Sequence, residues 1–179
     1  TSSISANIAI SRKEIAVPTC SAKTYNGASQ TLFASGTGYT AGGTTTGTNA
    51  GSYTATATPT ANYQWNTTSN KTSAQNVTCK INAYNLSNAT IASTSSTAYT
   101  GSAIKPTPKV TVPIPSGSTT TLTSGTHYTG AFTNNTNVGT ATLTITGKGN
   151  YTGTKTATFS ITNATISGSI TQNGALTYN

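Results

Sequence analysis

The chain has 179 residues and a formal net charge of +8, and only 33% of its residues are hydrophobic. Thr supplies about a quarter of the sequence, whereas Phe occurs three times and Met is absent. Helical proteins need Leu, Ala, Glu, Lys and Arg in quantity, so this composition argues against helix bundles and α/β folds. A Thr-rich chain suits pleated sheets with one wet face, and we expect an all-β fold.

The near absence of acidic residues limits the possible chemistry. There is no Asp, Glu14 is the only acidic side chain, and His127 is the only His. Glycosidase carboxylate pairs, Ser-His-Asp triads, calcium loops and zinc sites all need groups that this inventory does not supply. We therefore predict that the protein is not an enzyme and has no catalytic, cofactor-binding or metal-binding residues.

Charge and hydropathy also bear on location. The sequence contains no run of about 20 apolar residues of the kind that spans a membrane, so we expect no membrane insertion. Charged residues make up 6% of the chain, whereas about a quarter is usual for soluble domains. A surface of hydroxyls and amides with so few charges favours an extracellular location.

Taken in chain order, the first half of the sequence carries motifs that the second half repeats. The motifs of the first half are 25–27 (YNG), 49–52 (NAGS) and 62–63 (NY), and those of the second are 99–101 (YTG), 137–140 (NVGT) and 150–151 (NY). In both halves the Asn-Tyr pair begins 13 residues after the Asn that opens the middle motif. Residues 88–91 (NATI) recur as 163–166, and 178–179 (YN) resemble a third beginning. The sequence therefore holds two repeats and the start of another.

Between these motifs, apolar residues alternate with polar ones. Residues 140–146 read Thr-Ala-Thr-Leu-Thr-Ile-Thr, and a period of two predicts a half-buried strand. Residues 53–57, 77–81 and 157–161 alternate in the same way, and 110–114 give a further strand among prolines. Gly, Asn and Pro in the gaps favour turns. About seven short strands per repeat are typical of a sandwich, so we predict two tandem immunoglobulin-like antiparallel β-sandwiches.

The motifs set the expected domain boundaries. Residues 1–83 form the first sandwich and residues 84–163 the second. Residues 164–179 are the first strand of a further repeat or a strand that pairs with another subunit. For residues 165–179, packing back as a terminal strand is a third alternative.

The two cysteines lie in the first repeat only. Counted from the Tyr-x-Gly motif, Cys20 corresponds to Thr94 of the second repeat. In the alternating last strands of the repeats, 77–81 and 157–161, Cys79 corresponds to Phe159. Because both positions change together, we expect them to be neighbours and predict a Cys20–Cys79 disulfide. Closing a loop of that length contributes roughly 4 kcal/mol in the loop-entropy model. The alternative is two buried free thiols.

The second repeat resembles a known family. Its motifs are 99–106 (YTGSAIKP), 125–128 (GTHY), 134–140 (NNTNVGT) and 147–153 (GKGNYTG). They are similar to the immunoglobulin-like repeats of Gram-positive bacterial surface proteins, related modules of which occur on phage virions. The first repeat matches more loosely. The resemblance implies spacing, display or adhesion on a bacterial surface or a virion, with neighbouring immunoglobulin-like domains or identical subunits as partners, and it implies no catalytic residues.

Two aromatic residues are candidates for ligand contact. Trp65 is the only Trp and follows Tyr63 at two residues' distance. An exposed pair of this kind makes a platform on which sugars stack, so Tyr63 and Trp65 are possible glycan contacts. The alternative is that Trp65 packs in the core or at a sheet edge. For the Tyr-x-Gly and Asn-Tyr motifs we favour a structural role in turns and loop anchoring.

The basic residues are candidates for contact with anions. Nine Lys and Arg residues face one acid, and such an excess attracts anionic partners. Only Arg12 with Lys13, and Lys105 with Lys109, are close in sequence. Specific nucleic-acid binding usually needs a clustered basic face with aromatic residues between, so we predict diffuse attraction and no specific nucleic-acid partner.

These observations favour a structural or adhesive extracellular module that acts as a spacer or an appendage. The alternative is a module that binds carbohydrate or an anionic cell-envelope polymer.

Overall fold

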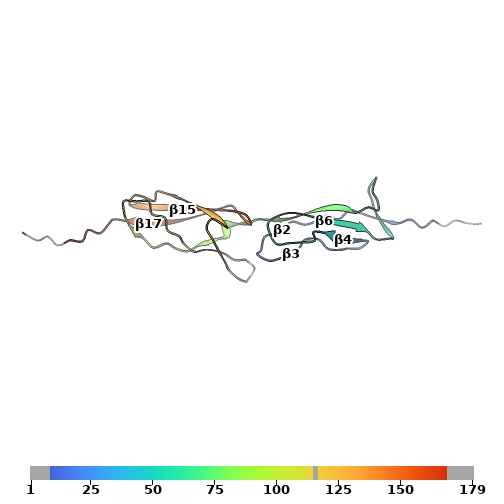
Figure 1. The fold of residues 1–179 in the computed structure, drawn as a ribbon, viewed down its shortest axis with the longest axis horizontal. Helices are drawn as coiled ribbons and strands as arrows, with labels where there is room; N and C mark the ends of the chain where they lie inside the picture. The colour runs from blue at the N-terminus through green and yellow to red at the C-terminus, as the bar shows by residue number, and fades with distance from the viewer. Residues whose placement is uncertain (1–8, 115–116, 169–179) are drawn as a thin grey trace, which may run out of the picture.

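The computed structural model describes residues 9–114 and 117–168, and these residues form two lobes that lie end to end (Figure 1). The fold is all-β, as the composition predicts. The helical content of the described residues is a single 3-10 turn, η1 (Leu86–Asn88). Within these residues, no helix has the length and apolar character needed to cross a membrane. The described N-terminal and C-terminal residues lie at opposite ends of the long axis (Figure 1).

The first lobe, here called unit 1 (residues 13–82), contains eight strands among the described residues. They are β1 (Lys13–Ile15), β2 (Lys23–Thr24), β3 (Gln30–Thr31), β4 (Tyr39–Gly43), β5 (Thr46–Gly47), β6 (Gly51–Pro59), β7 (Tyr63–Trp65) and β8 (Gln75–Asn82). The main sheet has the order β2-β8-β6-β4, and β1-β7 and β3-β5 form two-stranded sheets. β6 pairs antiparallel with both β4 and β8, whereas β2 runs parallel to β8.

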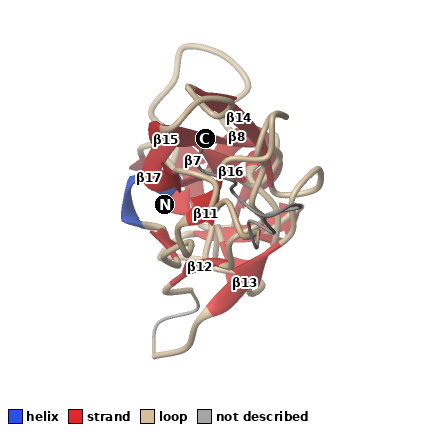
Figure 2. Ribbon diagram, turned by 90° about the vertical axis from the view of Figure 1, so that its left-hand side faces the viewer, coloured by secondary structure: helices blue, strands red, loops and turns tan. Residues whose placement is uncertain are grey.

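The second lobe, here called unit 2 (residues 84–162), follows the same plan. Its strands are β9 (Tyr84–Asn85), β10 (Thr90–Ile91), β11 (Thr97–Ala98), β12 (Val110–Val112), β13 (Thr120–Leu122), β14 (Tyr128–Thr133), β15 (Gly139–Gly147), β16 (Tyr151–Thr152) and β17 (Thr154–Thr162). The main sheet has the order β11-β17-β15-β14, and β10-β12-β13 forms a second sheet. In the view along the long axis, β14 and β15 lie opposite β12 and β13 (Figure 2), so unit 2 is a sandwich.

Strand register shows how closely the two units correspond. Tyr53 pairs with Cys79 in unit 1, and Ala141 pairs with Phe159 at the equivalent place in unit 2. The parallel pairs β1-β7 and β9-β16 correspond as well. All strand pairs of the described residues join strands within one unit. Of the further segment expected at 164–179, residues 169–179 lie outside the described residues, and residues 164–168 form no strand.

The alternating strands place their apolar residues in the cores. In β15 and β17, Leu143, Ile145 and Ile161 are at most 4% exposed, and the Thr residues between them are more exposed. The equivalent positions in β6 hold only Ala55 and Ala57. Trp65 lies in the same core cluster as these two alanines. Its indole therefore supplies the volume that Leu143 and Ile145 supply in unit 2.

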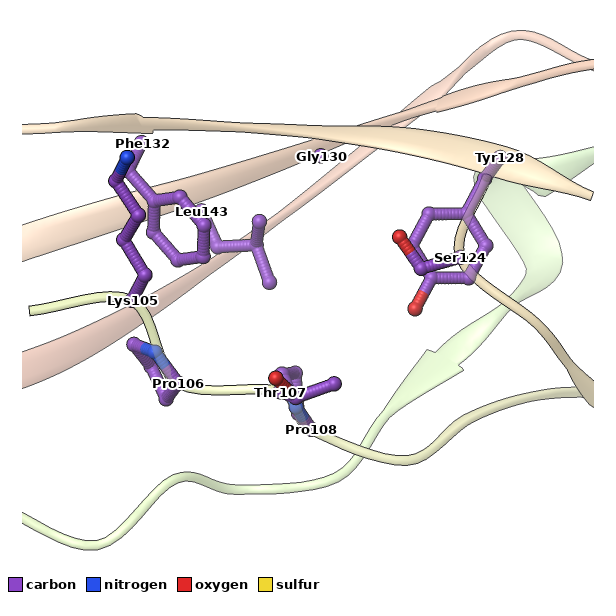
Figure 3. Close-up of a pocket in the computed structure, with 9 residues that line it drawn as sticks. All are labelled: Lys105, Pro106, Thr107, Pro108, Ser124, Tyr128, Gly130, Phe132 and Leu143. Atoms are coloured by element: carbon purple, nitrogen blue, oxygen red, sulfur yellow. The ribbon is translucent and has the colours of Figure 1, made fainter. Parts of the chain in front are cut away.

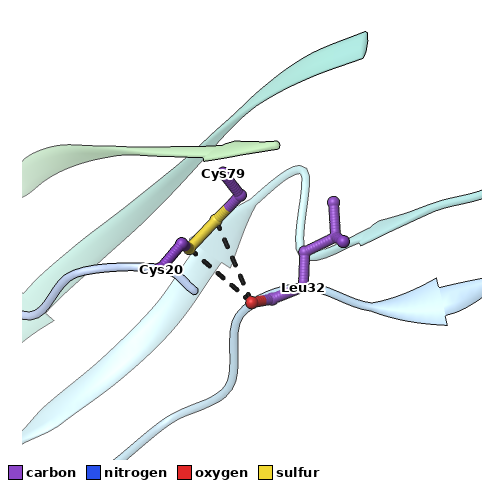
Figure 4. The surroundings of a disulfide bond; sticks show 3 residues. All are labelled: Cys20, Leu32 and Cys79. Carbon is purple, nitrogen blue, oxygen red and sulfur yellow. Dashed lines mark hydrogen bonds between the residues drawn. A yellow bond between two sulfur atoms is a disulfide. The ribbon is translucent and has the colours of Figure 1, made fainter. Parts of the chain in front are cut away.

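The two cysteines form the predicted disulfide, with Cα atoms 5.1 Å apart and a sequence separation of 59. Cys20 lies just before β2, and Cys79 lies within β8 (Figure 4). The Leu32 carbonyl oxygen lies 3.6 Å from Cys20 Sγ and 4.0 Å from Cys79 Sγ. Because a disulfide sulfur carries no proton, these are contacts and not hydrogen bonds. The bond ties the segment that leads into β2 to β8, the last strand of unit 1.

Candidate functional site

The predicted glycan contacts do not form an exposed platform. Trp65 is fully buried, and its Nε1–H donates a hydrogen bond to the Ser73 carbonyl oxygen at 2.9 Å. Tyr63 is half-buried. A sugar stacks on an open ring face, so the hypothesis that Trp65 is a stacking residue is wrong in this structure. Its alternative, core packing, is what the structure shows.

The four basic candidates lie in two separate groups. Arg12 Nε donates a hydrogen bond to the Ala61 carbonyl oxygen at 3.0 Å, beside exposed Lys13 in unit 1. Lys105 and Lys109 are exposed and lie in unit 2, on the segment between β11 and β12. The fold thus places the two sequence pairs in different lobes. Their role as anion contacts stays a prediction.

The only carboxylate is held by neighbouring donors. Glu14 Oε1 accepts hydrogen bonds from Lys71 Nζ at 2.8 Å and from Gln64 Nε2 at 3.1 Å. The Lys71 and Gln64 hydrogen bonds, with the Lys71 charge, lower the pKa of Glu14. A carboxylate whose ionised form is stabilised in this way is a poor general base.

The only imidazole and the only acidic side chain of the sequence lie in different units. His127 lies in unit 2, whereas Glu14 lies in unit 1, and His127 Nδ1 accepts a hydrogen bond from the Thr123 N–H at 2.8 Å. Within residues 9–114 and 117–168, no three His, Cys, Asp or Glu side chains come close enough to hold a metal ion. The described core contains no buried charged or polar residue.

A cavity of about 170 Å³ opens beside β14 (Figure 3). Phe132, Tyr128 and Leu143 form one wall, and Pro106 and Pro108 face them. Lys105 is the one charged side chain of its lining. The Ser124 and Tyr128 hydroxyls also belong to the lining, and they lie at the opposite end of the cavity from Lys105 (Figure 3).

Polar and aromatic side chains of both units meet at the junction between the units. Only Ala83 separates β8 from β9. β9 pairs at once with β16, Tyr84 opposite Tyr151 and Asn85 opposite Thr152. The chain therefore enters the fold of unit 2 within one residue of leaving unit 1.

One side-chain amide bridges the two units. Asn150 of unit 2 accepts a hydrogen bond at Oδ1 from the Ala50 N–H at 2.7 Å. Its Nδ2 donates to Asn49 Oδ1 at 3.0 Å. Asn49 and Ala50 belong to the loop before β6 in unit 1. Because the amide makes two hydrogen bonds, one as acceptor and one as donor, it fixes both the orientation of this loop and its distance from unit 2.

Aromatic rings pack beside this amide. Tyr25 of unit 1 meets Tyr151 of unit 2 edge to face, with ring centroids 5.5 Å apart, and His127 packs on Tyr151 at 5.4 Å. Tyr151 is 4% exposed. Burial, and after it the neighbouring Tyr25 hydroxyl, raise the pKa of Tyr151 to about 12. Tyr25 contacts the cores of both units.

Sequence reasoning found these motifs but not their contact across the units. The Tyr-x-Gly glycines do serve turns, with φ of 79° at Gly27 and 78° at Gly101. The signal for a junction was that each repeat carries both of the motifs that meet there. The Asn49-Ala50 motif recurs in the second repeat at 137–138, and the Asn150-Tyr151 motif is present in the first repeat at 62–63. Neither a family model nor a curated protein nor a solved structure matches the chain.

Proposed function

We propose that this chain is an extracellular structural module, a stiff spacer or appendage that carries mechanical load and performs no catalysis. The resemblance of the second repeat to immunoglobulin-like repeats is the reason for proposing a bacterial surface protein or a phage virion as the setting of this module. The disulfide is compatible with an extracellular location.

The observation that carries the proposal is that a strand near the start of each unit runs parallel to the last strand of that unit. In unit 2, β11 runs parallel to the end of β17, with Thr97 opposite Ile161. In unit 1, β2 runs parallel to the end of β8, with Lys23 opposite Ile81. Tension along the chain pulls the two strands of each pair in opposite directions along their length. The hydrogen bonds between them are then loaded together in shear instead of opening one at a time.

The disulfide adds a covalent path in unit 1. Cys20 lies on the segment between β1 and β2, and Cys79 lies within β8, the last strand of unit 1. Tension that enters before Cys20 and leaves after Cys79 passes through the bond. The loop between them then carries no tension, even if the noncovalent fold of unit 1 opens.

The junction supports the stiffness of the pair. A one-residue connection, the Asn150 bridge and the Tyr25–Tyr151 contact oppose bending between the units. Flexible spacers use longer polar linkers. A short connection with side-chain contacts on it is suited to holding a displayed element at a fixed distance.

Single-molecule stretching of the full chain tests the proposal. At about 3.5 Å per residue, unit 2 releases about 270 Å of chain when it opens. Oxidised unit 1 releases only about 40 Å, from the residues outside the disulfide loop, and reduction adds about 200 Å. A release of about 200 Å from unit 1 in the oxidised chain, or an opening of unit 2 without measurable resistance, would refute the load-bearing role.

The alternative function is binding to an anionic envelope polymer, which the net charge of +8 favours. Burial of Trp65 removes the main support for sugar stacking. A glycan and teichoic-acid array separates the two functions. A spacer gives no selective signal, whereas saturable binding that Lys105→Ala and Lys109→Ala weaken supports the alternative.

A further inference from the structure

Large apolar side chains remain exposed at the C-terminal end of unit 2. Tyr99 is 40% exposed, Val138 is 50% exposed and Ile166 is 97% exposed. The Tyr99 N–H donates to the Thr162 carbonyl oxygen, at the end of β17. Val138 adjoins Gly139, which pairs with Ile161 of the same strand. An exposed apolar end of this kind is the type of surface that stacks on another unit in repeat proteins.

Two of these residues occupy the positions that unit 1 uses at the internal junction. Tyr99 corresponds to Tyr25. The Tyr25 N–H donates to the Asn82 carbonyl oxygen at the end of β8, and the Tyr99 N–H donates in the same way to the Thr162 carbonyl oxygen at the end of β17. Val138 corresponds to Ala50, which is half-buried against Asn150.

The loop at this end repeats the polar half of the junction as well. Asn137 corresponds to Asn49, whose Oδ1 accepts from Asn150. Asn137 is exposed, and the segment 134–140 lines a hollow.

The opposite end of the molecule carries the complementary half. Asn62 and Tyr63 of unit 1 correspond to Asn150 and Tyr151 of unit 2. The Asn62 carbonyl oxygen accepts from the Lys13 N–H at 2.9 Å, as the Asn150 carbonyl oxygen accepts from the Tyr84 N–H at 2.9 Å. The Asn62 side chain is exposed, whereas Asn150 is half-buried.

A second hollow lies next to this pair. Its lining residues are Ile10, Ser11, Arg12, Ala61 and Asn62. Ile10 is 93% exposed, and it is the fourth large apolar side chain that the described surface leaves open.

We propose that the C-terminal end of unit 2 docks the N-terminal end of unit 1 of a second copy of this chain. The contact repeats the internal junction: Asn62 of the second copy bridges the Asn137 side chain and the Val138 N–H, and Tyr63 packs on Tyr99. Such a contact joins two different surfaces, so it extends head to tail into a linear chain of molecules. The inference rests on the proposed spacer function and gives that spacer a means of lengthening.

Charge and size determine how this association behaves. Each copy carries +8, so long-range repulsion opposes docking at low salt and screening relieves it. The surface is small and lacks the covalent connection that holds the internal junction together, so association is weak and depends on concentration. Salt strengthens this docking, whereas salt weakens any binding to an anionic polymer.

Amide NMR spectra of the full chain over a range of concentrations and salt test the docking. We expect the amide signals of Val138 and Tyr99, and the side-chain amide of Asn62, to shift with concentration, and more so at high salt. The Ala50 and Asn150 signals serve as internal references, because their contacts are already made within the molecule.

Variants establish the direction of the contact. Asn62→Ala removes the bridging amide at one end, and Tyr99→Ser removes the ring at the other, so each variant alone stays monomeric. Mixed together, the two variants form a one-to-one pair, because each supplies the intact end that the other lacks. Asn150→Ala is the matched control, since it loosens the internal junction and leaves both ends intact.

The outcomes are distinct. Concentration-dependent shifts at both ends, together with pairing of the mixed variants, support head-to-tail docking. A chain that stays monomeric at all concentrations overturns the proposal, as does association that both variants retain, or contacts of Tyr99 with residues after 168 of its own molecule. If stretching still shows the load-bearing behaviour in those cases, the spacer function stands and only the docking fails.

Discussion

Reduction of the Cys20–Cys79 bond is expected to destabilise unit 1 and leave unit 2 unchanged. The bond closes a loop of 59 residues. In the loop-entropy model a loop of that size lowers the entropy of the unfolded chain by about 14 cal/mol/K, which amounts to about 4 kcal/mol at 25 °C. Unit 2 has the same strand plan without a disulfide, so it serves as a control within the molecule.

The magnitude matters because unit 1 is small. At about 0.05–0.15 kcal/mol per residue, a unit of about 70 residues has a free energy of unfolding of roughly 4–10 kcal/mol. The loss of about 4 kcal/mol therefore removes a large part of the stability or all of it.

Trp65 provides the assay. It is the only Trp, it lies in unit 1, and it is fully buried, so its fluorescence reports on unit 1 alone. With a guanidinium slope of about 2 kcal/mol/M, reduction lowers the midpoint of the Trp65 transition by about 2 M. Far-ultraviolet circular dichroism follows the strands of both units, and the part of its transition that Trp65 fluorescence does not report, which belongs to unit 2, stays in place. A Trp65 midpoint that moves by less than about 0.5 M, or an equal shift of both transitions, would refute the reasoning.

Further predictions concern the junction and one turn. The Tyr151 phenol should ionise near pH 12 in ultraviolet difference spectra. Because its pKa is raised on folding, the stability that it contributes is complete below pH 10 and is lost as the pH rises towards 12. A Tyr151→Phe variant that keeps the same alkaline loss of stability would contradict this. Gly147→Ala should lower the free energy of unfolding of unit 2 by about 3 kcal/mol in denaturant titrations, because its Cβ would lie 2.5 Å from the Thr152 backbone nitrogen. Gly149→Ala, whose Cβ would meet nothing within 4 Å and whose φ is +65°, should cost only about 1 kcal/mol, and equal costs for the two variants would show that the close contact is unimportant.

The sequence was sufficient for the strands and the disulfide because both depend on local pattern and repetition. Alternation of Thr with Ala141, Leu143 and Ile145 is enough to define β15 and its buried face. The disulfide followed from the comparison of two copies, in which Cys20 and Cys79 are replaced together. A single copy would have left the pairing without support.

The burial of Trp65 and the junction could not be predicted in the same way. The burial of Trp65 depends on the space left by Ala55 and Ala57 on another strand, and the alternation of β6 gives no indication of which side chain fills it. The Asn150 bridge depends on how one unit is oriented on the next. That orientation follows from the immediate pairing of β9 with β16, which involves only two residues on each strand and has no periodicity to recognise.

The fixed orientation of the two units is the central claim, and residual dipolar couplings of the backbone amides measure it most directly. If the units form one stiff body, a single alignment tensor fits the couplings of residues 13–82 and 84–162 together. Two tensors of clearly different magnitude would mean that the units move independently at Ala83, and that result would contradict the account of the molecule as a rigid spacer.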